Sequence, residues 1–398
     1  MKILMLTKKL PYPVIDGECL VIMNELKALQ GEGTSIDVLA LNTQKHYSAL
    51  SEFPLEVNKL AHFYDVPIDT SIRAWDAMLN LFSNKSYNIQ RFWSDAFANK
   101  LKQLLNENAY DIIFLQGLYL VQYADIIKAN SRAKLVMRSH NVEHEIWQRL
   151  AVEEKSFFKK GYLNLLAERM KRYEESNINT CDAMIAITEK DLAKFKQMGL
   201  VKPSAAISGC IELNPASTGK REIRSVFFLG SFDWTPNIQG VYWFIENVWS
   251  GLSQEFPDWQ LYIAGRNFKQ EMAISQGECI HWVGEVKDAV GFMEEKNIMV
   301  VPLFSGSGMR IKIIEAMMCG KPIVSTSIGA EGINYTDGEN ILIADTAESF
   351  QKQLIRLMHD NEFAMGMGLN ARKNAEASYS MQTVGNRLRK FVFEEKGE

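Results

Sequence analysis

Short apolar runs recur along the chain, each followed by a polar or glycine-containing loop and then by apolar residues at helical spacing. The first run is Lys2 to Thr7, and after a loop come a helix over Val21 to Leu29 and a strand over Ser35 to Leu41. This order predicts a doubly wound α/β domain. Ligands of such domains bind beyond the carboxyl ends of the strands, so functional residues are expected in the loops that follow them.

A second α/β unit is predicted in the C-terminal half. The chain is loop-like from Ala206 to Arg224, and a new apolar run, Ser225 to Gly230, then opens the same strand, loop and helix order. The helical pattern at the end of the chain breaks near residues 378–380. We therefore predict an N-terminal domain, a C-terminal domain and a final helix over residues 1–207, 208–378 and 379–398.

The pattern of the stretch Ile298 to Thr326 predicts a strand, a glycine loop, a helix, a turn and a second strand. Ser305 to Gly308 has little bulk, so backbone N–H groups there can approach a ligand closely. Arg310 and Lys312 follow near the start of the helix, where cations oppose the helix dipole. Bound phosphate would explain them, whereas helix stability does not. Glu315, further along the helix, is placed to accept hydrogen bonds from hydroxyl groups. The alternative is a surface loop with both cations in solvent.

A second polar cluster, Arg138 to Glu145, follows the apolar strand Ala133 to Met137. It holds His140, His144 and two glutamates at a strand end, where this architecture places ligand-facing groups. The segment lacks the His-Glu-x-x-His order of a zinc helix, and no third ligand is evident, so we expect no metal here. Asp182 to Thr188 is expected to be the last strand of the first domain.

Composition narrows the function classes. The 398 residues include 44 basic and 48 acidic ones, and the net charge of −4 argues against a nucleic-acid binder. Five scattered cysteines indicate reduced thiols in a cytosolic protein. The N-terminal apolar run is too short for a signal peptide, and no stretch approaches the roughly 20 apolar residues of a membrane span. These features favour a cytoplasmic protein.

One helical segment offers a membrane contact. Lys155 to Glu175 mixes aromatic and basic residues, which suits either a helix packed on the sheet or a basic amphipathic surface on anionic lipid. Packing on the sheet is the favoured interpretation. Peripheral contact at the inner membrane face is the alternative.

Glu315-Ala316-Met317-Met318-Cys319-Gly320-Lys321-Pro322-Ile323-Val324 resembles the second half of the signature of the family 4 retaining glycosyltransferases, the glycosyl transferases group 1. That signature begins with a further acidic residue, but Ser307 stands at its position, eight residues before Glu315. The resemblance implies an α/β GT-B fold. Such a fold has two facing Rossmann-like doubly wound domains, a cleft between them, and a C-terminal helix that crosses back to the N-terminal domain.

The resemblance extends to Gly230-Ser231-Phe232-Asp233-Trp234-Thr235-Pro236-Asn237 and to Arg138 to Glu143, whose patterns recur in one subgroup. Many family members carry an Arg and a Lys for the donor diphosphate in the first of these loops. Both are missing here, and we interpret Arg310 and Lys312 as their replacement. The resemblance places His140 beside the anomeric carbon of the donor sugar. It places these further residues at the donor: Gly17, Gly230, Ser231, Arg266, Val283, Gly284, Ser307, Gly308 and Met309.

These features predict a retaining, metal-independent glycosyltransferase that moves a hexose from a nucleotide diphosphate sugar to an acceptor hydroxyl. The catalytic residues would be His140, Arg310, Lys312 and Glu315, with no cofactor and the nucleotide sugar as co-substrate. The acceptor would be a glycan or lipid-linked saccharide in cell-surface polysaccharide assembly. The alternatives are a nucleotide-sugar epimerase of the same fold and a degenerate nucleotide-sugar-binding protein. A nicotinamide dehydrogenase is a weaker alternative, because Lys8 to Glu18 lacks a Gly-x-Gly-x-x-Gly motif.

Overall fold

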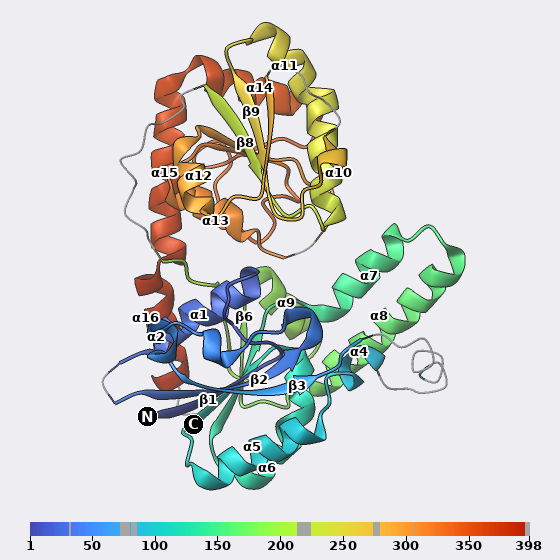
Figure 1. Cartoon of the computed structure of the whole chain (residues 1–398), viewed down its shortest axis with the longest axis vertical. Helices are drawn as coiled ribbons and strands as arrows, with labels where there is room; N and C mark the ends of the chain where they lie inside the picture. The colour runs from blue at the N-terminus through green and yellow to red at the C-terminus, as the bar shows by residue number, and fades with distance from the viewer. Residues whose placement is uncertain are drawn as a thin grey trace. The chain divides into compact units, whose positions relative to one another are not determined.

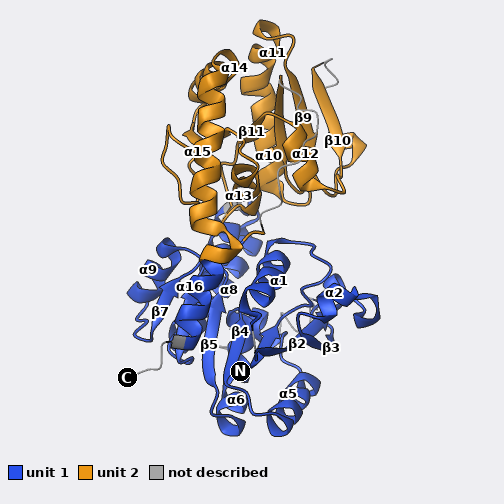
Figure 2. Ribbon diagram, turned by 90° about the vertical axis from the view of Figure 1, so that its left-hand side faces the viewer, with its two compact units in different colours: residues 1–210, 384–398 blue, residues 211–383 orange. Residues whose placement is uncertain are grey.

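The computed structural model describes residues 1–31, 33–71, 80, 86–212, 224–273, 279–306 and 308–394 (Figure 1). The chain divides into two compact units (Figure 2). Unit 1 comprises residues 1–210 and 384–398, and unit 2 comprises residues 211–383. Ser307, one of the predicted donor residues, lies outside the described residues.

Unit 1 is built on a seven-stranded parallel sheet with the order β3-β2-β1-β4-β5-β6-β7. Most of its strands are apolar and buried along their whole length, as expected for parallel strands covered on both faces. The strands are β1 (Lys2–Thr7), β2 (Ser35–Thr43), β3 (His62–Ile68), β4 (Ile112–Gln116), β5 (Lys134–Ser139), β6 (Ala183–Ala186) and β7 (Ser204–Ala206).

Helices connect these parallel strands. Helix α1 starts at Gly17 because the carboxylate of Asp16 accepts a hydrogen bond from the Cys19 N–H at 3.0 Å. The longer helices are α1 (Gly17–Leu29), α5 (Asp95–Glu107), α6 (Ala124–Asn130), α7 (Glu143–Glu153), α8 (Phe157–Asn177) and α9 (Glu189–Gln197). Shorter turns are η1 (Gln44–His46), η2 (Leu50–Glu52), α2 (Leu55–Asn58), α4 (Tyr87–Gln90) and η3 (Leu118–Tyr123).

Unit 2 repeats the plan with a six-stranded parallel sheet of order β10-β9-β8-β11-β12-β13. Its strands are β8 (Ser225–Leu229), β9 (Gln260–Ala264), β10 (Ile280–Gly284), β11 (Ile298–Val301), β12 (Ile323–Ser325) and β13 (Leu342–Ile343). Its helices are α10 (Thr235–Phe244), the π-helical η4 (Ile245–Trp249), α11 (Ser250–Glu255), η5 (Gln270–Met272), α12 (Ala289–Glu295), α13 (Ile311–Met318), α14 (Ala347–His359) and α15 (Asn361–Tyr379). The predicted strands and helix around the glycine loop are confirmed as β11, α13 and β12.

The last helix, α16 (Met381–Glu394), begins in unit 2, and from Val384 onward it belongs to unit 1. Arg387 donates to the Ala206 carbonyl at 2.9 Å, and Lys134 donates to the Val392 carbonyl at 3.3 Å. A Cβ on Gly385 would lie 3.2 Å from the Cβ of Ala28, so the helix packs closely on α1. The predicted return of the C-terminal helix to the N-terminal domain is therefore confirmed.

One sequence prediction about the sheet is wrong. The strand within Asp182 to Thr188 is β6, and it is not the last strand of unit 1, because β7 pairs with it through Met184 and Ser204. Strand β7 has only the three residues Ser-Ala-Ala, which form no apolar run. None of the described helices is both long and apolar enough to cross a bilayer.

Candidate functional site

The sheet of unit 1 has its switch point between β1 and β4, where the connections leave in opposite directions. Loops after such neighbouring strands leave a crevice at the carboxyl edge, where α/β folds bind ligands. Lys8 follows β1, and its ammonium lies 4.9 Å from the ring centre of Tyr119, which follows β4. His140 follows β5 at the same edge. The fold therefore gathers polar side chains from three strand ends.

Two lysines and two carboxylates form an ion-pair cluster beside the start of α1. Glu18 lies 3.3 Å from Nζ of Lys8 and 3.0 Å from Nζ of Lys9, and Lys9 also contacts Asp16 at 2.5 Å. Burial alone would raise the pKa of Glu18, but Lys8 and Lys9 lower it to about 2. Burial likewise opposes the charge of Lys9, yet its carboxylate neighbours raise its pKa. The cluster is therefore fully ionised near neutral pH. Gly17 lies within it, as the first residue of α1.

His140 is held in one tautomer by a chain of hydrogen bonds. The Gln116 amide donates through Nε2 to Glu25 at 2.8 Å, so its Oε1 is left to accept from Nε2 of His140 at 2.9 Å. Glu25 is itself paired with the Arg138 guanidinium at 2.7 Å. Burial, assisted by the charge of Arg138, lowers the pKa of His140 to about 4. The imidazole is therefore neutral, with Nε2 protonated and Nδ1 available as an acceptor.

Two other polar residues of the His140 segment, Arg138 and His144, make contacts that stabilise unit 1. Arg138 is fully buried and donates to backbone carbonyls of Ala186, Ile207 and Ser208. Nδ1 of His144 lies 2.6 Å from Glu174, which ties α7 to α8.

Glu143 has an unusual environment in the same segment. It accepts a hydrogen bond from the Tyr119 hydroxyl at 3.0 Å. Burial raises the pKa of Glu143 to about 7, with the nearby Glu174 charge adding to the rise and Lys8 opposing it. This carboxyl therefore titrates near neutral pH.

At the corresponding edge of unit 2, backbone hydrogen bonds join the loops that carry three predicted donor residues, Gly230, Arg266 and Gly284. The Gly265 N–H donates to the Gly284 carbonyl at 2.8 Å, and the Phe232 N–H donates to the Arg266 carbonyl at 2.9 Å. A Cβ on Gly265 would lie 1.6 Å from the carbonyl oxygen of Gly230, so only glycine fits there. Gly230, Arg266 and Gly284 therefore lie on adjoining loops after β8, β9 and β10.

The predicted side chains in these loops differ in their contacts. The side chain of Arg266 is exposed, and Val283 is 43% exposed. The Ser231 hydroxyl donates to the Asp233 carboxylate within the same loop. These loops thus present mainly backbone and solvent-facing groups at the strand ends.

The glycine loop meets the loop after β8 at the switch point of unit 2. The guanidinium of Arg310 lies 5.1 Å from the ring centre of Trp234 and donates to the Gly308 carbonyl. Gly306 has a positive φ of 104°, and a Cβ there would lie 2.4 Å from the Trp234 ring. The loop therefore fits around an aromatic face only with glycine at this position.

Lys312 and Glu315 contact each other on α13. Nζ of Lys312 lies 2.7 Å from Oε2 of Glu315, whose side chain is largely buried. Met309 is partly buried against the apolar cluster of this unit. Arg310 and Lys312 thus stand beside the glycine loop, as predicted, while Glu315 faces a cation within the chain. Ser307 lies outside the described residues.

Two features of unit 1 were not singled out from the sequence. One is the cluster of Lys8, Lys9 and Glu18, which two lysines directly after a strand could have indicated. The other is Gln116, whose contact with His140 depends on the β4–β5 pairing that sets Gln116 opposite Arg138.

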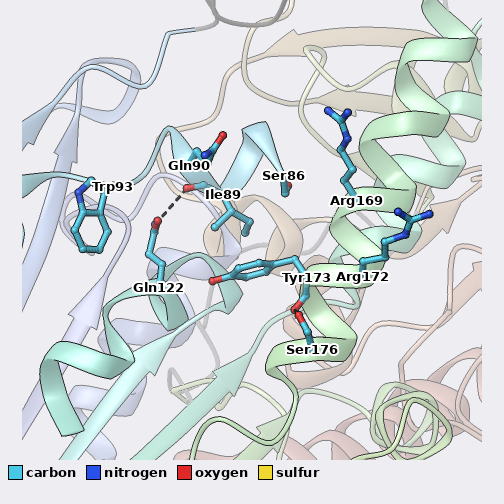
Figure 3. A pocket seen from close by; sticks show the side chains of 9 residues that line it. All are labelled: Ser86, Ile89, Gln90, Trp93, Gln122, Arg169, Arg172, Tyr173 and Ser176. Atoms are coloured by element: carbon cyan, nitrogen blue, oxygen red, sulfur yellow. Dashed lines mark hydrogen bonds between the residues drawn. The ribbon is translucent and has the colours of Figure 1, made fainter. Parts of the chain in front are cut away.

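A separate hollow of about 670 Å³ lies in unit 1 (Figure 3). Arg169 and Arg172 line it from α8, but Arg169 already donates to Asn80 at 2.8 Å and Arg172 to Glu168 at 3.0 Å. Gln122 donates to the Ile89 carbonyl at 3.2 Å. These three polar side chains of the hollow are therefore engaged within the chain. Within the described ranges, no cluster of three or more His, Cys, Asp or Glu side chains is arranged to hold a metal ion.

Comparisons with known proteins place part of the chain in a known family. Residues 223–360 match the family model of Glycosyl transferases group 1. A protein of Klebsiella pneumoniae named "Uncharacterized 44.6 kDa protein in cps region" is 24% identical over 396 residues, covering 96% of this chain and 97% of that protein.

Two solved structures show the fold. Sucrose-phosphate synthase from Thermosynechococcus elongatus matches with a TM-score of 0.71 at 15% identity, covering 99% of both chains. Anabaena Alr3699/HepE in complex with UDP-glucose matches with a TM-score of 0.66 at 15% identity, covering 99% of this chain and 100% of that one. The chain therefore has the GT-B fold, and its group 1 segment supports a glycosyltransferase enzyme.

Proposed function

We propose that this chain is a retaining, metal-independent glycosyltransferase that moves a hexose from a nucleotide diphosphate sugar to an acceptor hydroxyl. Its context would be cell-surface polysaccharide assembly at the inner membrane face, with a glycan or lipid-linked saccharide as acceptor. The name of the Klebsiella relative, from a cps region, supports this context. The UDP-glucose bound to the Anabaena protein supports a nucleotide-sugar donor.

The observation that carries the proposal is the position of Arg310 and Lys312 beside the glycine loop of unit 2. Both cations follow a glycine loop that packs against Trp234, at the sheet edge where α/β folds bind ligands. A departing nucleotide diphosphate gathers negative charge, and preorganised cations stabilise such charge in the transition state. In this proposal Lys312 exchanges its contact with Glu315 for a phosphate, and Glu315 then accepts from a ribose or sugar hydroxyl.

In the transfer, the bond from the anomeric carbon to the phosphate oxygen breaks and a bond to the acceptor oxygen forms. The acceptor proton passes to the leaving phosphate oxygen, so no side chain is required as general base. Nδ1 of His140 accepts from a sugar hydroxyl and orients the ring. We assign further donor contacts to the loops that carry Gly17, Gly230, Ser231, Arg266, Val283, Gly284, Ser307, Gly308 and Met309.

The test is a thermal-shift and hydrolysis screen with UDP-, GDP-, ADP- and dTDP-sugars in the presence of EDTA. It compares wild type with Arg310→Ala/Lys312→Ala and with Lys352→Ala/Lys373→Ala, which removes two exposed lysines from unit 2. We expect one nucleotide family to stabilise wild type and the control pair, with slow sugar loss that disappears in the first variant.

The other outcomes contradict the proposal in distinguishable ways. Release of an altered nucleotide sugar without acceptor would indicate an epimerase. Stabilisation without sugar loss, even with saccharide acceptors supplied, would indicate a binding protein. Equal sugar loss in wild type and in Arg310→Ala/Lys312→Ala would remove the role given to these cations.

A further inference from the structure

Helices α7 and α8 pack along each other as a hairpin that extends beyond the sheet of unit 1 (Figure 1). The turn between them, together with the end of α7 and the first turn of α8 (residues 150–160), is called the hairpin tip here. Phe157 and Phe158 are 83% and 87% exposed, and Val152 is 74% exposed. The two phenyl rings contact each other edge to face, with centroids 5.9 Å apart. Large apolar side chains gathered at one exposed point mark an interaction site.

Basic residues surround this apolar pair. Lys155, Lys159 and Lys160 are exposed beside the two rings. Over the hairpin tip there are three basic and two acidic residues, although the whole chain has a net charge of −4. Lys159 and Lys160 lie in the first turn of α8, where cations oppose the helix dipole, so helix stability does not account for them. Aromatic rings between cations are complementary to an anionic surface with an apolar layer beneath it.

We propose that the hairpin tip is a membrane anchor that places Phe157 and Phe158 among the headgroups of an anionic bilayer. Its lysines would contact lipid phosphates. Apolar burial and electrostatic attraction together are the two signals that give stable peripheral binding. A second protein chain is the competing occupant, but the excess of basic residues around the rings favours anionic lipid.

The base of the hairpin is built to hold the tip in place. Glu174 of α8 accepts from the backbone N–H groups of Glu143 and His144 and contacts Nδ1 of His144 at 2.6 Å. These contacts join the first turn of α7 to the last part of α8. The tip is therefore presented on a braced pair of helices, which suits insertion at a fixed depth.

The experiment is co-sedimentation of the whole chain with phosphatidylcholine vesicles, with or without phosphatidylglycerol, at two salt concentrations. We expect binding only to the anionic vesicles, and weaker binding at high salt. Phe157→Ser/Phe158→Ser should reduce the partition coefficient at least about tenfold. Lys155→Gln/Lys159→Gln/Lys160→Gln should reduce it by roughly fivefold per lysine.

The matched control is Met365→Ser/Leu369→Ser, which removes an exposed apolar pair from α15 in unit 2, and this variant should bind vesicles like wild type. Thermal melts check that every variant is folded. Failure of wild type to bind anionic vesicles would overturn the proposal, as would equal loss in the control pair. A phenylalanine-dependent dimer without vesicle binding would assign the tip to a second copy. No nucleotide sugar is present, so the outcome is independent of the proposed transfer reaction.

Discussion

Nε2 of His140 lies 2.9 Å from Oε1 of Gln116, and the amide nitrogen of Gln116 lies 2.8 Å from Glu25. Because Glu25 can only accept, the orientation of Gln116 is fixed, and so is the tautomer of His140. Gln116→Leu should release the ring to protonate at either nitrogen. We expect a rise in the Nδ1-protonated form by ¹⁵N NMR of labelled histidine, and a fall in kcat of about tenfold with little change in KM.

Gln122→Leu is the control for this substitution. Gln122 donates to the backbone carbonyls of Ile89 and Tyr119, and within the described residues it makes no hydrogen bond to His140. It should leave the imidazole tautomer unchanged. An unaltered His140 spectrum in Gln116→Leu would contradict the orienting role of Gln116.

The lowered pKa of His140 predicts a pH dependence of stability. The folded value is about 4 and the unfolded value 6.5, so the folded state disfavours the protonated ring. The stability that the neutral His140 ring contributes is fully present above about pH 6.5 and is lost as the pH falls toward 4. We expect the free energy of unfolding, from urea titrations, to fall less steeply over this window in His140→Asn than in wild type. Parallel curves for the two proteins would show that His140 is readily protonated in the fold.

The raised pKa of Glu143 predicts a pH dependence of stability opposite in sign to that of His140. Burial raises its folded pKa to about 7 from 4.5, so the folded state favours the protonated carboxyl. The associated stability is present below about pH 4.5 and is lost as the pH rises through 7. Glu143→Gln keeps an acceptor for the Tyr119 hydroxyl and carries no charge. Relative to wild type it should gain stability between pH 6 and 8 in urea titrations, and a loss at pH 8 would contradict the raised pKa.

The sequence predicted the fold best where the signal is local. The apolar run before the glycine loop is β11, and the break near residues 378–380 separates α15 from α16. Strand β3 was not predicted, because its sequence, His-Phe-Tyr-Asp-Val-Pro-Ile, carries polar residues and a proline at the edge of the sheet. Edge strands lack the continuous apolar run that marks buried parallel strands.

The candidate site was predictable only in part, for a related reason. Gly230, Gly265 and Gly306 can be recognised from the sequence because they are glycines in loops after strands. The structure shows why glycine is needed, since a Cβ at each would collide with a neighbour. The partner of His140 does not, because Gln116 is brought to it by strand pairing between residues far apart in the chain. The catalytic roles of His140 and Arg310 stay predictions until activity is measured.

Glu18 is expected to be a major electrostatic support of unit 1. Its carboxylate is the shared partner of Lys8 and Lys9, and both lysine side chains are mostly buried. Glu18→Gln leaves two cations with one carboxylate, Asp16, so the free energy of unfolding should fall by about 2–3 kcal/mol. Glu168→Gln is the control: its pair with Arg172 is exposed, and the loss should be under about 0.5 kcal/mol. Equal effects in both variants would contradict the importance of burial at Glu18.

Gly240 lets helix α10 pack closely against the backbone from which the glycine loop of unit 2 begins. It lies in α10, and a Cβ there would approach the carbonyl oxygen of Pro302 to 2.1 Å, at the end of β11 where the glycine loop begins. Backbone cannot yield as a side chain does, so Gly240→Ala should cost about 2–3 kcal/mol. Gly366→Ala in α15 meets nothing within 4 Å and should gain roughly 0.5 kcal/mol. In thermal melts with nucleotide sugar, Gly240→Ala should also show a smaller ligand-induced shift than wild type, because the displaced loop carries Arg310. A full ligand shift at reduced stability would show that α10 supports the sheet without positioning the loop.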